Sequence, residues 1–234
     1  RMGEIDGFIA GEPWGSVAIV EGLAELILPG VSIWRRGVEK LLAMRTEWME
    51  ANPDTVDRLL RALSRAAAWC DDPAHHMELA HLLEQPRYVG QPAEFLITAL
   101  SGTLYARLDD VPIHVPDFLL FHRDNANFPW KSQALWIYSQ FLRWRMTAPT
   151  PEREENARAV FRPDVYRRAL APLGLPTGGV SGILEDGGHT DPATADSIAF
   201  SPDCFFDGRG FDPGDIPGYI SGFPPLALSG TEEA

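Results

Sequence analysis

A short turn near the start of this chain has the residue types and spacing of a binding site. In the run DGFIAGEPWGS, an apolar segment from Ile5 to Ala10 leads through Gly11, Glu12, Pro13 and Trp14 into residues with helical spacing. The expected order is therefore strand, turn and helix. At such a turn the first N–H groups of the helix lie at the carboxyl end of the strand, and the helix dipole adds roughly half an elementary positive charge. The pattern predicts a site for a small anion.

Gly11 and Glu12 have possible roles in that site. Gly11 has no side chain, so a ligand can approach its backbone closely, and the N–H groups of residues 15–17 are the expected donors. The carboxylate of Glu12 would repel an anion, so we expect it either to hold the turn through backbone N–H groups or to orient Lys40. The alternative is a plain strand-to-helix connection in which Trp14 packs into the core.

Lys40 is the candidate cation. It follows Val38 and Glu39, and a bound anion with one charge needs one compensating cation, because a buried unpaired charge costs several kcal/mol. The alternative is a solvated lysine paired with Glu39, with Arg45 or with water.

The composition excludes several classes of protein. The chain has 234 residues, of which 45% are hydrophobic, so it can form one large core or two small ones. Its net charge of −13 argues against direct binding of nucleic acid, although one cation and several N–H donors can still attract an anion locally. No apolar run is long enough to span a membrane. Cys70 and Cys204 have no metal-ligand spacing, and we expect no metal and no cofactor.

The chain also lacks the motifs of common enzymes. It contains no GxSxG, no P-loop, no CxxC and no GxGxxG, and no pair of acids stands out as a catalytic couple. We therefore expect a binding protein and not an enzyme. His122 and Arg123 could contact an anion, but packing of the histidine beside an apolar run is the favoured interpretation.

Helical signals dominate the rest of the chain. The strongest helix should start at Asn52-Pro53-Asp54, with Asn52 as its N-cap and Pro53 at its first position, and Asp71-Asp72-Pro73 should end it. Residues 39–45 fit either a strand or the beginning of a helix, and periodicity leaves both open. The other expected helices are residues 15–26, 46–51, 74–83, 91–100 and 129–144, two helices in 151–173 broken at Arg162-Pro163, and a last short one ending near Gly222.

The turn, with WRRGVEKLLAMRTEWMEANPDTVDRLLRAL and NFPWKSQALWIYSQFLRW, resembles the solute-binding proteins of nitrate and bicarbonate ABC importers, the NrtA/CmpA type, and the related cytosolic nitrate sensor NasS. The resemblance implies an α/β, two-lobed, periplasmic-binding-protein-like fold of type II, with the N-terminal lobe largely missing and a helix-rich C-terminal part. Residues 1–90 would be the second-lobe portion with the anion site, and within it the resemblance favours a strand at residues 39–45 followed by a helical turn at 46–51. Residues 91–234 would return to the first lobe and pack on it, with a flexible loop at 177–202.

The same resemblance implies capture of nitrate or nitrite between two lobes. Lys40 matches a lysine of nitrate-binding relatives, where bicarbonate binders tend to carry an acid, so the implied ligand residues are Gly11, Glu12, Pro13, Trp14 and Lys40. An importer would work with an ABC permease and be periplasmic or membrane-associated. A sensor would be cytoplasmic and bind an antitermination regulator. The rival is an enzyme on the same fold, similar to thiamine-precursor synthases. Since no Met precedes Arg1, we expect the chain to be the second part of a longer protein.

Overall fold

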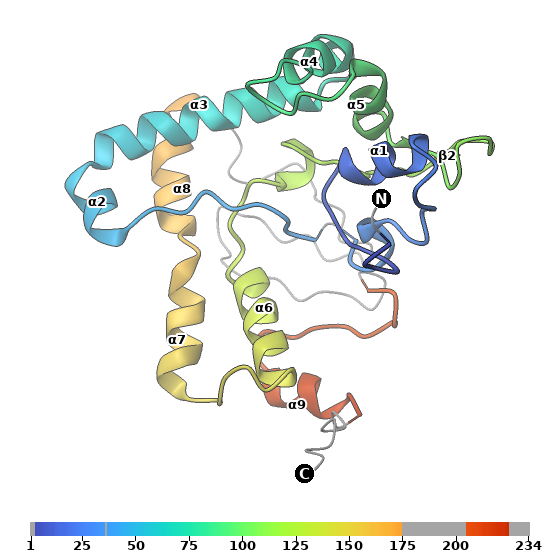
Figure 1. Ribbon diagram of the computed structural model, residues 1–234. Coiled ribbons are helices and arrows are strands. Elements are labelled where there is room, and N and C mark those ends of the chain that lie inside the picture. Colours follow the sequence, from blue (N-terminus) through green and yellow to red (C-terminus); the bar gives the residue numbers. More distant parts are fainter. Residues whose placement is uncertain (1–2, 36, 175–204, 225–234) are drawn as a thin grey trace. The chain divides into compact units, whose positions relative to one another are not determined.

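A computed structural model describes residues 3–35, 37–174 and 205–224, and most of the regular structure in these ranges is helical (Figure 1). The α-helices are α1 (Trp14–Val20), α2 (Thr46–Ala51), α3 (Pro53–Asp71), α4 (His76–Leu83), α5 (Ala93–Leu100), α6 (Lys131–Arg143), α7 (Pro151–Val160), α8 (Pro163–Leu170) and α9 (Ile216–Ser221). Strands β1 (Thr103–Leu104) and β2 (Ile113–His114) form a small antiparallel pair. None of the helices in these ranges has the length and apolar character needed to cross a membrane.

The chain divides into two compact units. Unit 1 comprises residues 1–37 and 62–127, and unit 2 comprises residues 38–61 and 128–234. Helix α3 contributes its first part to unit 2 and the remainder to unit 1. The expected division into residues 1–90 and 91–234 concerns the lobes of a larger fold and stays a prediction. The expected loop at 177–202 lies outside the described residues.

The helices with strong local signals are confirmed. Helix α3 begins at Pro53 and ends at Asp71, as the Asn-Pro-Asp start and the Asp-Asp-Pro stop predicted. The break between α7 and α8 falls at Arg162-Pro163. The helix expected over residues 15–26 is shorter, because α1 ends at Val20 and the chain turns at Gly22, whose φ is +68°.

The two segments with strand-like patterns do not form strands in the described structure. Residues 3–10 contain no strand, and Ile9, in the predicted strand Ile5–Ala10, is 98% exposed. Residues 39–45 contain neither a strand nor a helix. A strand is stable only when a neighbour pairs with it, and no described segment pairs with either one. The strand predicted at Ile5–Ala10 is therefore wrong for this structure.

Unit 1 has its core between α4 and α5. The buried side chains there come from both helices and from β1, and they include Leu79, Ala80, Ala93, Leu96 and Leu104. Gly102 joins α5 to β1 at a φ of +66°, and a Cβ on it would lie 2.5 Å from the carbonyl oxygen of Val115. This close approach requires glycine.

Unit 2 has its core around α6, α8 and α9. Its fully buried large side chains include Leu135, Leu170 and Phe211. The hydroxyl oxygen of Thr150 accepts the Arg153 N–H at the start of α7, as an N-cap does.

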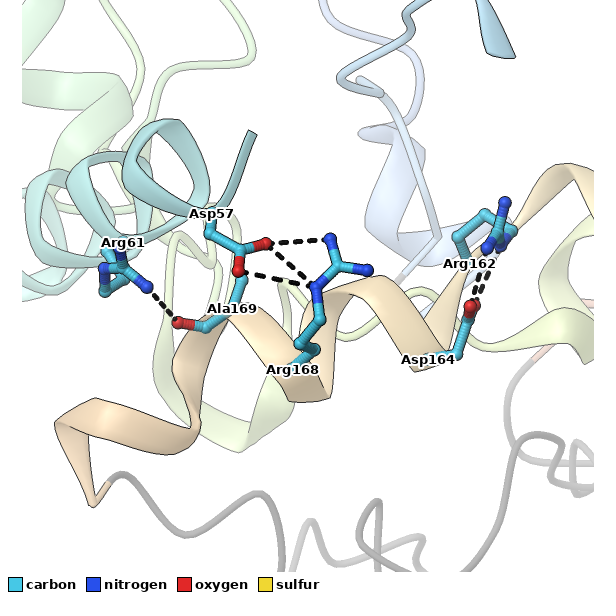
Figure 2. Close-up of polar contacts among 6 residues, drawn as sticks. All are labelled: Asp57, Arg61, Arg162, Asp164, Arg168 and Ala169. Carbon is cyan, nitrogen blue, oxygen red and sulfur yellow. Dashed lines mark hydrogen bonds and ion pairs between the residues drawn. The ribbon is translucent and has the colours of Figure 1, made fainter. Parts of the chain in front are cut away.

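Two polar contacts fasten the first part of α3 to α8, and Figure 2 shows them together. The guanidinium of Arg168 donates to the carboxylate of Asp57 at 2.9 Å, and Arg61 donates to the carbonyl oxygen of Ala169 at 2.9 Å. At the start of α8, Arg162, the residue before the helix, binds the carboxylate of Asp164 through two nitrogens, and this pairing lowers the pKa of Asp164. These bonds join residues 53–61 of α3 to α8 within unit 2.

Candidate anion site

The turn that the sequence singled out lies in unit 1 and leads directly into α1. The Trp14 N–H donates to the carbonyl oxygen of Gly11 at 3.3 Å, and Pro13 is buried beneath the turn after a cis Glu12–Pro13 peptide bond. The chain therefore makes the predicted tight entry to a helix. The structure brings Gly11, Glu12, Pro13 and Trp14 together at this place.

Two of the three expected N–H donors already have acceptors inside the chain. The Ser16 N–H donates to the carboxylate of Glu12 at 3.3 Å, and the Val17 N–H donates to the carbonyl oxygen of Pro13 at 2.9 Å. A Cβ on Gly15 would lie 3.0 Å from Oε1 of Glu12, so this carboxylate lies against the first turn of α1. The geometry agrees with the turn-holding alternative for Glu12.

Two details differ from the sequence-based picture of the turn. Gly11 is not among the described glycines with positive φ, so its backbone does not require glycine, and only the close approach of a ligand argues for it. Trp14 is 49% exposed and is therefore not the core residue of the connector interpretation. Its indole is available to a ligand or a partner.

Lys40 belongs to unit 2, within a stretch that has no regular secondary structure. Its ammonium lies 3.6 Å from Oε2 of Glu39, and its side chain is 86% exposed. An ion pair this exposed contributes at most about 1 kcal/mol, because water solvates both partners. The pairing with Glu39 that the sequence allowed is thus present, and the role of Lys40 as an anion anchor stays a prediction.

The structure contains a second set of converging N–H donors, which the sequence analysis did not predict. The carboxylate of Asp71, at the end of α3, accepts the N–H groups of Phe121, His122 and Arg123 at 3.1, 3.3 and 2.6 Å. The side chain of Asp71 is only 9% exposed. Consecutive N–H groups that converge in this way form an anion-binding nest, and here the chain fills it with its own carboxylate. We call it the Asp71 nest.

The Asp71 nest engages the backbone of the His-Arg pair that the sequence offered as a possible anion contact, while the Nδ1 of His122 is buried and has no hydrogen-bond partner among the described residues. The guanidinium of Arg123 lies 3.4 Å from the carboxylate of Asp117, and its backbone N–H is held by Asp71. Asp71 and Phe121 are 50 positions apart, so no local pattern could reveal the contact.

The described residues offer no centre for metal or thiol chemistry. No group of three or more His, Cys, Asp or Glu side chains in the described ranges is placed to hold a metal ion. Burial, with a smaller effect of the Asp71 carboxylate, raises the pKa of the Cys70 thiol. A raised pKa keeps the sulfur protonated and less nucleophilic, which argues against Cys70 as the reactive group of an enzyme. Cys204 lies outside the described residues.

Comparison with known proteins identifies relatives along most of the chain. The NMT1-like family model matches residues 1–84. The nitrate import ATP-binding protein NrtC of Synechococcus elongatus is 35% identical over 75% of this chain and 26% of its own length. The nitrate/nitrite binding protein NrtA of the same organism is 29% identical over 97% of this chain and 48% of its own length.

The fold agrees with these sequence matches. The crystal structure of the periplasmic nitrate-binding protein NrtA from Synechocystis PCC 6803 superposes with a TM-score of 0.78 at 25% identity, covering 90% of this chain and 51% of that one. The chain thus spans about half the length of the NrtA proteins that it matches. Sequence and fold together show that the chain is similar to the nitrate/nitrite binding proteins NrtA and has a part of their periplasmic-binding-protein fold of type II.

Proposed function

We propose that this chain takes part in binding nitrate or nitrite as a component of an ABC-type importer. The observation that carries the proposal is the match to NrtA, which extends over 97% of the chain in sequence and 90% in structure. Both of those relatives are named for binding nitrate or nitrite.

The proposed ligand residues are those that the sequence pattern and the resemblance single out. The turn of Gly11, Glu12, Pro13 and Trp14 supplies backbone groups and an exposed indole, and Lys40 supplies the positive charge. Binding would require Lys40 to exchange Glu39 for the anion. That exchange costs little, because the existing ion pair is exposed and weak. The anion would lie between two lobes, and closure of the lobes would exclude water from it.

The names of the relatives support a transport partner. NrtC and CmpC are ATP-binding proteins of nitrate import and bicarbonate transport, so we propose that this chain acts with ABC transporter components, a permease among them. ATP binding itself is not carried over, because the sequence has no P-loop. The cytosolic sensor, with its antitermination regulator, remains the alternative. The enzyme alternative has less support, because these relatives are named for binding and transport.

Calorimetry on the protein in its full encoded length, titrated with nitrate, nitrite and bicarbonate, tests the proposal. We expect nitrate or nitrite to bind with a measurable heat that the Lys40→Ala variant reduces. A preference for bicarbonate, or no heat with any of the three anions, would contradict it. Binding of nitrate that is unchanged in Lys40→Ala would retain the function and reject the assigned residue.

A further inference from the structure

We draw no further inference here: the strongest candidate, the loop of residues 117–125 at the Asp71 nest, where the Nδ1 of His122 is buried without a hydrogen-bond partner among the described residues, carries none, because nothing in the described ranges shows which ligand or partner that nitrogen would contact.

Discussion

At the scale of single residues, a substitution of Lys40 tests whether this side chain binds the anion or is only a surface residue paired with Glu39. If Lys40 anchors the anion in a closed cleft, Lys40→Ala should weaken nitrate binding by about 2–4 kcal/mol, the cost of leaving one side of a buried charge pair unpaired. Lys131, the other lysine of the sequence, provides the matched control. Calorimetry that finds equal affinities in the parent and in Lys40→Ala would assign Lys40 to the surface, paired with Glu39.

Tyr166 is the residue whose environment predicts a pH dependence. Burial raises the pKa of its hydroxyl to about 12, above the ordinary value near 10. A raised pKa means that the stabilisation is complete below pH ~10 and is lost as pH rises towards 12, because the unfolded chain ionises first. Two pKa units correspond to about 2–3 kcal/mol.

Denaturant unfolding between pH 8 and 12 measures this effect, with pH 8 as the plateau below both pKa values. The parent should lose stability above pH ~10, and Tyr166→Phe should lose distinctly less. Tyr88→Phe serves as the control, since that side chain is 52% exposed. Identical alkaline slopes in the parent and in Tyr166→Phe would contradict the assignment.

At the scale of elements, the helices could be predicted from the sequence and the strands could not. Helix α3 was readable because Pro53 at its first position and Asp72-Pro73 after its end are local signals. The pattern of residues 5–10 is typical of a strand, but a strand is stable only when another strand pairs with it. The sequence of the segment itself does not show whether such a partner is present.

The candidate site shows the same limit. The turn from Gly11 to Trp14 was found because its residues are adjacent, and the bond from the Ser16 N–H to Glu12 is one of the two roles expected for that carboxylate. The Asp71 nest was not found, because its donors lie about 50 residues away along the chain.

The Asp71 nest should contribute to the free energy of unfolding, and a substitution of Asp71 tests this. Asp71→Asn replaces a charged acceptor of three N–H groups with a neutral one, so we expect a loss of about 2–4 kcal/mol of unfolding free energy. Asp72→Asn is the control, because Asp72 accepts a single N–H, from Ala74, at an exposed position. Urea unfolding measures both variants. Equal midpoints for the two would show that the nest contributes nothing particular to stability.

At the scale of the whole molecule, the chain spans about half the length of the NrtA proteins that it matches. A cleft between two lobes takes donors from both, and each lost hydrogen bond costs about 0.5–1.5 kcal/mol. We therefore expect the 234 residues alone to bind nitrate about 100-fold more weakly than Synechocystis NrtA does, or not at all. Parallel calorimetry of the two proteins measures the ratio. Equal affinities would mean that the site is complete within this chain.

The carboxylates of Asp71 and Glu12 also bear on selectivity. Each is an anion tethered to the backbone donors that it occupies, so its effective concentration at those donors is of the order of millimolar or higher. A dilute anion in solution must compete with that built-in occupant at every encounter. Under the proposed function, the Asp71 nest stays closed to stray anions, and nitrate binds only where Lys40 exchanges Glu39 for it and the anion displaces the Glu12 carboxylate from the Ser16 N–H.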